Sequence, residues 1–557
     1  MVKKHCLLLF FCLLFNLCLQ AQDKKSPVSV NGNIQSDILF PEEDKDIGAA
    51  AYKETALTNT YLDLNLMSAY VNAGGRFEFL KYPLPGFEPD FAGWGVPYMY
   101  ITGNYKNIKL TVGDFYDQFG SGFILRSYQE RSLGIDNAIR GARLIAEPVR
   151  GVNIKALGGQ QRRYFKHNKG YLIGGDMELN FDQWFSKMQE NNTFFMLGGS
   201  FITKNEEDED IMIITPEAID KLNIPQNVAA YDIRARLQKG NYSFLLEYAN
   251  KFNDPAFDNK YIYKNGTAWL FSSSYSKRGI SVLLQAKRSD NMVFRSKRTD
   301  SSVAASFINH LPAFSMQHTY SLAALYPYAT QPGGEWAYQG IFAYSFKRNS
   351  TLGGKYGTNI KINASQIRAI DKQFVVEYNP DNPLSLMGTD GYSSSFFKMG
   401  DETYYQDINI SIDKKLTKDF KINLMYMNLL SNEWIIRQHG EKLRANIFIG
   451  EGKFQISDKL TLRSELQYLN TKDDEGDWVA GLIELSLLPS FMFTVSDMYN
   501  AGETKLHYYK ALVTFTYKSH LLQIGYGRTR AGFDCSGGIC RVVPASRGIQ
   551  FAYNYNF

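Results

Sequence analysis

Apolar and polar residues alternate with a period of two along most of this chain, and no other feature constrains its fold as strongly. The same pattern recurs at residues 231–238, 242–248 and 407–413. Near residue 460, one set of residues is apolar and the interleaved set is polar: Leu460, Leu462, Leu466 and Tyr468 against Thr461, Arg463, Glu465 and Gln467. Successive side chains of a β-strand point to opposite faces, so the pattern predicts many strands with one apolar face each.

Three details favour a membrane barrel over a soluble β-sandwich, which would show the same alternation. The alternating segments run for about 9–12 residues, the length that a tilted strand needs to cross a bilayer. The chain is rich in Tyr and Phe, 36 and 38 residues, and these recur near segment ends, where aromatic girdles meet the membrane surface. The chain also ends on aromatic residues at every second position, which resembles the insertion signal of outer-membrane barrels: Phe551, Tyr553, Tyr555 and Phe557.

The expected fold is therefore a closed, antiparallel, transmembrane β-barrel, because backbone polar groups in hydrocarbon must all be paired. In such barrels short periplasmic turns alternate with long extracellular loops. A first pass gives about 26 strands, but the segments 122–128 and 315–325 break that alternation, so we assign both to loops. The expectation becomes about 24 strands, with 22 to 26 as the range and both termini in the periplasm. It includes a short turn at 73–75 and long connections at 114–140 and 158–169.

The first residues have the arrangement of a secretory signal peptide. Lys3 and Lys4 precede an apolar stretch from Cys6 to Leu19, and Ala21 offers a small residue for cleavage. We predict a signal peptide at 1–21 and one outer-membrane barrel domain at 22–557; a membrane anchor is the alternative. Removal of two lysines leaves 59 of the 61 basic residues against 56 acidic ones. A chain so balanced in charge is not expected to bind nucleic acid.

Cleavage would also remove three of the five cysteines and leave only Cys535 and Cys540. Two cysteines this close in an exported chain predict one disulfide.

One long connection, residues 114–140, is expected to fold into the barrel lumen. It is rich in glycine and apolar residues, yet it carries charges of both signs. Buried charges need partners, so this mixture suits a loop inside a polar lumen better than a loop in water. An ordinary external loop is the alternative. The candidate lumen-plug residues are Asp114, Tyr116, Asp117, Arg126, Arg131, Asp136 and Arg140.

Three motifs carry a resemblance to a known family: GDFYDQFGSG at 113–122, GIDNAIRG at 134–141 and CSGGICR at 535–541. They resemble the recurring motifs of an uncharacterised outer-membrane protein family of the Bacteroidota. The resemblance spans most of the mature chain. It implies an outer-membrane location and a barrel fold, and it implies no substrate and no catalytic residue.

Two functions of different classes fit these features. The first is a porin-like or transport channel of weak charge selectivity, because the charges expected to face the lumen mix both signs: Asp232, Arg234, Arg236, Glu247, Arg463 and Glu465. The alternative is a non-conducting barrel that serves as a scaffold or accessory subunit of an outer-membrane assembly, export or surface-anchoring complex. Its motivation is the set of long loops and the suspected lumen-filling segment. The expected partners are outer-membrane lipid, the barrel-assembly machinery, and a surface or periplasmic protein.

The sequence gives little reason to expect catalysis, a cofactor or a metal site. The histidines of the mature chain form no His-x-x-x-His or Glu-x-x-His pair, and no Gly-x-Ser-x-Gly motif is present. Carboxylates cluster at 205–210 and 473–477 and could take Ca²⁺ or Mg²⁺, but they lack the fixed spacing of an EF-hand loop. We expect two solvated acidic loops and no enzyme activity.

Overall fold

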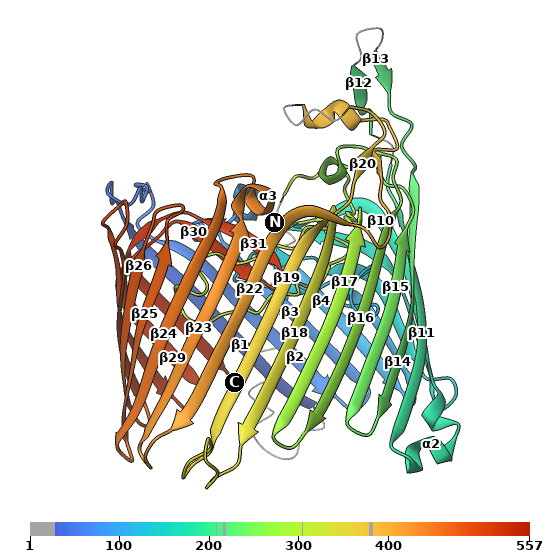
Figure 1. The fold of residues 1–557 in the computed structure, drawn as a ribbon. Helices are drawn as coiled ribbons and strands as arrows, with labels where there is room; N and C mark the ends of the chain where they lie inside the picture. The colour runs from blue at the N-terminus through green and yellow to red at the C-terminus, as the bar shows by residue number, and fades with distance from the viewer. Residues whose placement is uncertain (1–27, 208, 215–218, 303–304, 378–381) are drawn as a thin grey trace.

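A single closed sheet forms the wall of the molecule (Figure 1). The computed structural model describes residues 28–207, 209–214, 219–302, 305–377 and 382–557; the expected signal peptide, 1–21, lies outside them. Within this part of the chain, 24 strands form one antiparallel sheet. The sheet closes where β1 (Val28–Glu42) pairs with β32 (Ser546–Asn556). Closure leaves no wall strand with an unpaired edge. The predicted fold and strand number are confirmed.

The remaining wall strands lie between these two in chain order. They are β2 (Leu57–Ser68), β3 (Val71–Leu80), β4 (Gly93–Tyr105), β5 (Ile108–Phe115), β8 (Ile139–Ala146), β9 (Val152–Arg163), β10 (Lys166–Asn180), β11 (Thr193–Asn205), β14 (Asn227–Lys239), β15 (Tyr242–Lys251), β16 (Gly266–Lys277), β17 (Ile280–Asp290), β18 (Gly334–Phe346), β19 (Thr358–Ile370), β22 (Met399–Lys415), β23 (Phe420–Asn432), β24 (Lys442–Ser457), β25 (Leu460–Thr471), β26 (Trp478–Leu487), β27 (Phe491–Asn500), β28 (His507–Tyr517) and β29 (His520–Thr529).

Short and long connections alternate around most of the wall, so the barrel has a short-turn end and a long-loop end; the exceptions include the two-residue β9–β10 connection at the long-loop end and the longer connection 181–192 at the short-turn end. The turns at the short-turn end include Ala69-Tyr70 and Lys518-Ser519. Val28 pairs with Ser68 beside the first of these turns, so the first strand starts at this end. The last strand finishes at the same end. The segments 122–128 and 315–325 both lie in loops, as the parity argument predicts.

The predicted turn at 73–75 is wrong, because these residues lie inside β3. The glycines there serve packing rather than turning. A Cβ on Gly74 would stand 2.7 Å from the ring of Tyr100 on β4. The small residue therefore makes room for a neighbouring aromatic ring.

The predicted long connection at 158–169 is also wrong. β9 runs to Arg163, β10 starts at Lys166, and two residues join them. The sequence suggested a loop because this stretch is polar. Its polar side chains instead continue the inner face of the wall, where Arg162 pairs with Glu78.

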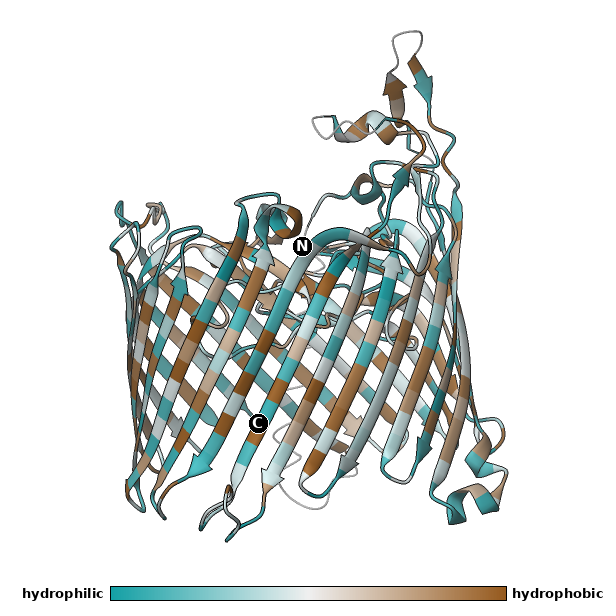
Figure 2. Ribbon diagram, in the orientation of Figure 1, coloured by the Kyte–Doolittle hydropathy of each residue, from teal (hydrophilic) through white to brown (hydrophobic). Residues whose placement is uncertain are grey.

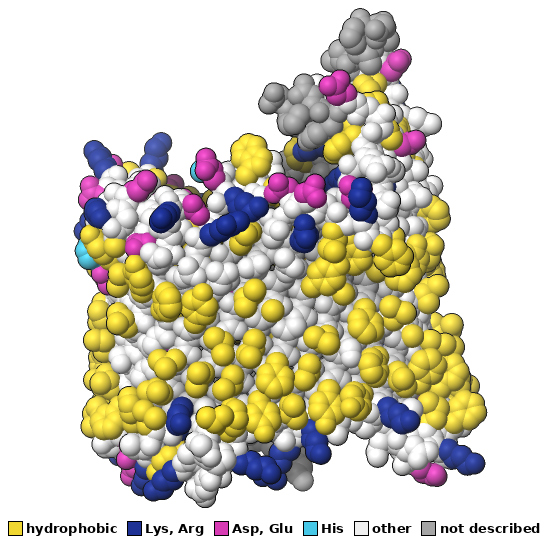
Figure 3. All heavy atoms as spheres, in the orientation of Figure 1, with side chains coloured by type: hydrophobic (Ala, Val, Ile, Leu, Met, Phe, Trp, Pro, Cys, Tyr) yellow, Lys and Arg dark blue, Asp and Glu magenta, His cyan; other side chains and the backbone are white. Residues whose placement is uncertain are grey.

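The two faces of the wall differ in polarity, as Figure 2 shows by the alternation of colours along each strand. On the paired strands β14 and β15, Ile233 is 61% exposed and Leu246 50% exposed on the outer face. Their neighbours Arg234 and Glu247 are buried inside. In Figure 3 hydrophobic side chains cover the visible face of the wall between two rims that carry charged side chains.

Smaller elements decorate the connections. Among the residues that the structure describes, no helix has the length and apolar character needed to span a membrane. The helical turns are η1 (Pro89–Phe91), η2 (Phe181–Gln183), α2 (Ser186–Glu190), η3 (Phe257–Asn259), η4 (Pro383–Leu386) and α3 (Glu433–Arg437). The small hairpins pair β6 (Gln129–Glu130) with β7 (Ile135–Asp136), β12 (Met212–Ile214) with β13 (Ile219–Lys221), β20 (Gln373–Phe374) with β21 (Tyr392–Ser393), and β30 (Gly532–Ser536) with β31 (Ile539–Val543).

Candidate functional site within the barrel lumen

Two loops fold into the barrel and share a hydrophobic core; we call them together the plug. They are residues 116–138, between β5 and β8, and residues 291–333, between β17 and β18. Their apolar side chains are almost completely buried: Phe119, Phe123, Ile124, Leu125, Met292, Phe294, Ile308, Leu311, Phe314 and Leu322 are each at most 4% exposed. The plug therefore fills the long-loop end of the lumen with a hydrophobic core like that of a folded domain.

The two plug loops are also joined by backbone and side-chain hydrogen bonds. The Arg126 N–H donates to the Ile308 carbonyl at 2.9 Å, and the His310 N–H donates to the Gly122 carbonyl at 3.0 Å. The side-chain amide of Asn309 donates to the Phe123 carbonyl at 2.8 Å. The loops therefore form one packed unit.

The plug is bonded to opposite sides of the wall. Arg131 donates to Gln35 on β1 at 3.0 Å, and the Ser121 hydroxyl donates to Glu247 on β15 at 2.6 Å. The backbone N–H of Leu322 donates to Gln467 on β25 at 3.0 Å. Because β1, β15 and β25 lie far apart around the barrel, the plug spans the lumen (Figure 1).

A buried ion network fixes the first plug loop to the wall. Asp136 of the plug accepts from Arg76 on β3 at 2.8 Å and from Arg162 on β9 at 2.7 Å. Arg162 also pairs with Glu78 at 2.6 Å, and both side chains are 1% exposed. Removing one partner from a buried pair costs about 3–5 kcal/mol, so Asp136 anchors the plug firmly.

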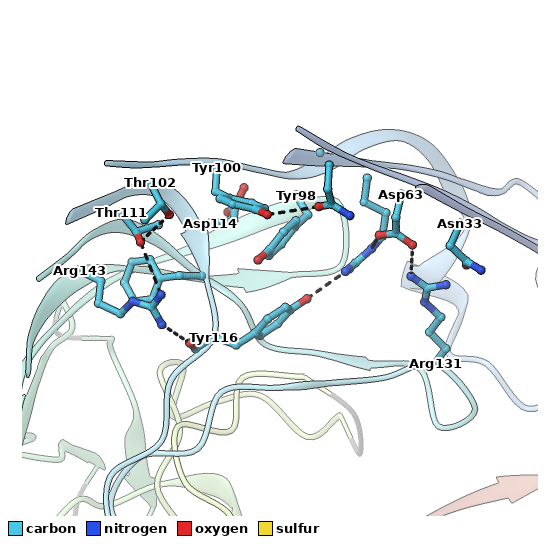
Figure 4. A pocket seen from close by; sticks show the side chains of 14 residues that line it. Asn33, Asp63, Tyr98, Tyr100, Thr102, Thr111, Asp114, Tyr116, Arg131 and Arg143 are labelled. Carbon is cyan, nitrogen blue, oxygen red and sulfur yellow. Dashed lines mark hydrogen bonds and ion pairs between the residues drawn. The ribbon is translucent and has the colours of Figure 1, made fainter. Parts of the chain in front are cut away.

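A polar and aromatic cavity of about 560 Å³ lies beside this network, between the plug and strands β1 to β5. Figure 4 shows Tyr116, Arg131 and Asp63 among the side chains that surround it, with Arg131 hydrogen-bonded to Asp63. The Tyr116 hydroxyl donates to Asp136 at 2.9 Å, and its ring stacks on Tyr98 at 5.2 Å between centroids. Positive and negative side chains around the cavity are paired, which suits a neutral polar solute or water better than an ion.

The charges predicted to face the lumen lie in two clusters. Arg234 bonds to Asp232 at 2.9 Å and to Glu178 at 2.8 Å beside a cavity of about 220 Å³ that Arg236 and Glu247 also line. Arg463 bonds to Glu451 at 3.2 Å, to Glu484 at 3.5 Å and to Glu465.

The structure places five of the seven candidate plug residues in the first plug loop. Arg126 lies 4.7 Å from the ring centroid of Tyr128, and Asp117 accepts from Lys155 at 2.9 Å. Asp114 and Arg140 instead belong to the wall, opposite each other on β5 and β8, with Arg140 donating to Asp114 at 2.6 Å. Their pairing extends the strand ladder, so the loop is two residues shorter at each end than expected.

The sequence interpretation missed the second plug loop and the strand residues that bind the first one. Residues 291–333 form the longest connection, and the apolar segment 315–325 within it fits no wall strand. A long connection with an apolar segment could have indicated the second plug loop, because an apolar segment that is not part of the wall must be buried elsewhere. Arg76, Glu78 and Arg162 are brought together only by the closed sheet, and no local pattern reveals their contact.

The β30–β31 hairpin lies across the long-loop end of the lumen, against the plug (Figure 1). A disulfide joins Cys535 and Cys540. The ring of His310 donates from Nε2 to the Gly537 carbonyl at 2.8 Å, and the Thr330 N–H donates to Gly538 at 2.8 Å. Burial, aided by the positive charge of Arg126, lowers the pKa of His310 to about 3. The ring is therefore neutral at physiological pH, which suits a buried donor to a carbonyl.

The C-terminal aromatic residues lie on the outer face of the last wall strand. Phe551 on β32 is opposite Ile38 of β1 and Ile524 of β29, and Ile524 is 48% exposed. Tyr553 and Tyr555 follow on the same face. Tyr555 stacks on His520 at 4.1 Å and on Phe557 at 5.4 Å between ring centroids.

Parts of the two acidic clusters are not solvated as expected. Glu206 is 5% exposed and pairs with Lys204 and Arg298, each at 3.0 Å. Asp474 accepts from the hydroxyl of Tyr326 in the plug at 2.6 Å. Each of these two carboxylates is therefore bonded to the plug, Glu206 to Arg298 and Asp474 to Tyr326. Across the described ranges, no group of three or more His, Cys, Asp or Glu side chains is arranged to hold a metal ion.

Fold and site together define a class: a closed 24-stranded β-barrel of the outer-membrane type, filled at one end by two of its own loops. The chain belongs to the family of unknown function DUF6029, whose model matches residues 1–557. A comparison with curated proteins found no match.

Solved outer-membrane barrels resemble the chain at low sequence identity. The P pilus usher PapC translocation pore is 8% identical at a TM-score of 0.43, over 95% of this chain and 99% of that one. The siderophore receptor PirA from Pseudomonas aeruginosa is 10% identical at a TM-score of 0.39, over 96% and 81%. Acinetobacter baumannii OccAB3 is 10% identical at a TM-score of 0.33, over 95% and 99%. These similarities concern the barrel fold only.

Proposed function

We propose that this protein is an integral outer-membrane barrel, closed to solutes in its resting state, that acts as a scaffold or anchoring subunit for a protein complex. The observation that carries the proposal is the plug, whose shared hydrophobic core spans the lumen. Opening the lumen would expose side chains such as Phe119, Phe123 and Leu125. Each contributes about 1.5–3 kcal/mol of burial free energy, so opening is costly without a partner.

The orientation in the membrane follows from the two ends of the barrel. Outer-membrane barrels place short turns in the periplasm and long loops outside the cell. On that rule the short-turn end, with Val28 and Phe557, is periplasmic, and the plug and the β30–β31 hairpin lie toward the cell exterior. The apolar belt supports this membrane location, and so does the resemblance of three motifs to a Bacteroidota outer-membrane family.

A scaffold needs an exposed surface for its partner, and the long-loop end offers one. The described parts of the connections β11–β14 and β19–β22, residues 206–207, 209–214, 219–226, 371–377 and 382–398, project beyond the rim on one side of the barrel (Figure 1). Exposed apolar side chains lie on these loops and on a neighbouring one: Ile219 is 65% exposed, Leu384 52% and Phe252 50%. Apolar groups held in water above the membrane belt are suited to contact with another protein. We name this surface the projecting face.

A narrow transport channel is the second candidate function. The observation in its favour is the cavity of about 560 Å³, which has a polar lining next to the ion network that holds the plug. In that case the plug would move within the lumen, and paired charges would select weakly among polar solutes.

Planar-bilayer conductance of the purified barrel distinguishes the two candidates. Three proteins are compared: the full chain, a variant with 117–137 replaced by a Gly-Ser linker, and a control with 209–222 of the projecting face replaced likewise. Each must first show heat-modifiable migration, the sign of an intact barrel. We expect no steady conductance from the full chain or the control, and a conductance from the plug variant. Steady conductance from the full chain would favour the channel.

The scaffold role itself is tested by association at the cell surface. Crosslinking of intact cells should join a defined partner to the full chain and to the plug variant. It should not join that partner to the variant that lacks 209–222. Equal crosslinking of all three proteins would show that the projecting face does not bind the partner.

A further inference from the structure

One outward-facing position at the top of the membrane belt carries an arginine. In the register of the wall, Arg288 of β17 lies between Trp269 of β16 and Trp336 of β18. Arg288 shares its face with Leu284, which is 55% exposed to the outside. The flanking Lys287 points inward, where it pairs with Glu335 at 2.7 Å. Yet Arg288 is only 3% exposed, so something covers it from outside.

The cover is the last part of the loop 371–398. Arg288 donates from Nη2 to the Ser394 hydroxyl at 2.9 Å, and its guanidinium carbon lies 5.4 Å from the centre of the Phe396 ring. Asp290, 3.4 Å from Arg288, accepts from the Tyr392 hydroxyl at 2.7 Å. The segment 392–397 therefore lies over the outer surface of the wall, where it shields the charge of Arg288, while Asp290 at the end of β17 supplies the opposite charge.

Phe396 also completes a row of aromatic rings around the barrel. Tyr248 contacts Trp269 at 4.5 Å between centroids, and Trp269 contacts Phe396 at 5.5 Å. Phe396 contacts Trp336 at 5.8 Å, and Trp336 stacks on Tyr338 at 5.7 Å. The loop residue fills the place in the row where β17 has an arginine.

The next residue, Phe397, is 86% exposed although its ring lies 4.8 Å from that of Phe396. The side chain of Lys398 follows; it pairs with Asp371 at 3.0 Å and is still 62% exposed. We propose that the segment 392–397 lies in the interfacial zone of the outer leaflet and inserts Phe397 among the lipids. An aromatic ring beside the membrane girdle is stabilised by lipid, and a lysine beside it reaches the headgroups. The inference rests on the proposed outer-membrane location.

The depth is limited by the backbone of the segment. Irregular backbone does not occur against lipid within the hydrocarbon region, since its polar groups would lose hydrogen bonds. Ser394 and Tyr392 are bonded to Arg288 and Asp290, but the segment is not part of a wall ladder. At interfacial depth, level with the aromatic row, the Phe397 ring contacts lipid while the polar backbone of the segment can still bond to water and headgroups.

Site-specific fluorescence tests this depth. The two cysteines of the mature chain are joined in a disulfide, so an introduced cysteine supplies one free thiol for an environment-sensitive dye. The test variant is Phe397→Cys. The controls are Leu284→Cys in the lipid-facing wall and Ile219→Cys on the projecting face. Each labelled barrel is placed in phospholipid vesicles that contain lipids spin-labelled either near the headgroup or deep in the acyl chain, and is also exposed to an aqueous quencher.

We expect strong quenching at position 397 by the shallow spin label and weak quenching by the aqueous quencher. Position 284 should respond to the lipid labels and position 219 to the aqueous quencher alone. If position 397 responds as position 219 does while position 284 is quenched by lipid, the inference fails and the membrane location stands. If position 284 is not quenched by lipid either, both the membrane location and the inference are overturned.

Discussion

The ring of Phe557 lies directly over Gly32, so that a Cβ at position 32 would stand 2.5 Å from the ring atom Cζ. The backbones of the two residues also exchange hydrogen bonds, at 2.9 and 3.0 Å. The final residue of the chain thus packs on the first strand at the seam where the barrel closes. A side chain at position 32 and the ring at position 557 compete for one space.

A side chain at Gly32 should therefore weaken closure of the barrel. Gly32→Val forces the Phe557 ring to move, and overpacking of this kind costs about 1–3 kcal/mol. We expect a smaller fraction of heat-modifiable, folded barrel on gels. Gly103→Val is the matched control, because Gly103 lies in the wall strand β4 with nothing within 4 Å of an added Cβ. Equal folded fractions for both variants would contradict the role of the seam contact.

Replacing Phe557 by Ser should lower the amount of protein in the outer membrane more than it lowers synthesis. The change removes the terminal aromatic residue of the chain and its contact with Gly32. Quantitative blotting of total and outer-membrane fractions measures the effect. Phe491→Ser is the control, since Phe491 is a 43% exposed aromatic residue at the same end of the barrel. Unchanged membrane levels for the Phe557 variant would show that the C-terminal pattern is no insertion signal here.

Neutralising Asp136 should loosen the plug and leave the wall intact. Asp136→Asn takes one negative charge away from Arg76 and Arg162, which keep Asp63 and Glu78 as partners. The cost is therefore below the value of about 3–5 kcal/mol for a buried charge left without any partner. We expect faster proteolysis within 116–138 and the onset of unsteady conductance. Glu130→Gln, on the same loop, is the control, because the Glu130 carboxylate accepts hydrogen bonds from Ser132 within its own turn. Identical proteolysis of both variants would refute the anchoring role of Asp136.

Replacing Cys535 and Cys540 by Ser should leave barrel assembly nearly intact and raise proteolysis of the β30–β31 hairpin. The disulfide closes a short ring, which the chain-entropy model values at about 2 kcal/mol, little beside a closed sheet. Thiol labelling of intact cells provides the direct measurement. We expect labelling only after reduction. Two reactive thiols on correctly assembled protein without reductant would rule the disulfide out.

Acid should release the β30–β31 hairpin from the plug. The pKa of His310 is lowered from its usual 6.5 to about 3, so the folded protein keeps the ring neutral while a released ring takes up a proton below 6.5. The contribution of neutral His310 is therefore fully present above pH 6.5 and is lost progressively as the pH falls toward 3. Hairpin proteolysis should rise over this window. The control is His310→Gln, whose side-chain amide can donate a hydrogen bond but does not titrate. If proteolysis of the hairpin in this variant rises with acid as much as in the natural chain, the prediction is contradicted.

Period-two alternation was sufficient to predict the wall, because the residues of each strand show by themselves which face is apolar and which is polar. The mixed charges around Arg131 and Asp136 were sufficient to predict that their loop folds inward. Boundaries were harder. The glycines at 73–75 predict a turn, whereas Gly74 makes room for Tyr100 within β3. The polar residues near Arg162 predict a loop, whereas they extend the inner face of β9.

Contacts between distant segments account for the rest of the site. Asp136 meets Arg76 and Arg162 only because the sheet closes and brings their strands around the plug. Arg288 faces outward on β17, and the residues that cover it come from the connection between β19 and β22. Neither relationship has a local pattern, since in each case the partner lies dozens of residues away in the sequence.

The plug has a consequence for the order of assembly. Its first loop leaves the wall after β5, its second after β17, and its bonds reach β22, β24 and β25. The partners of the loops lie on many strands of the wall, so the loops can complete their packing only after most of the wall has formed. We therefore expect assembly to pass through a hollow stage in which Phe119, Phe123 and Ile124 are exposed to water. Packing of the plug would then be the step that seals the lumen, and a membrane holding the barrel would leak until that step.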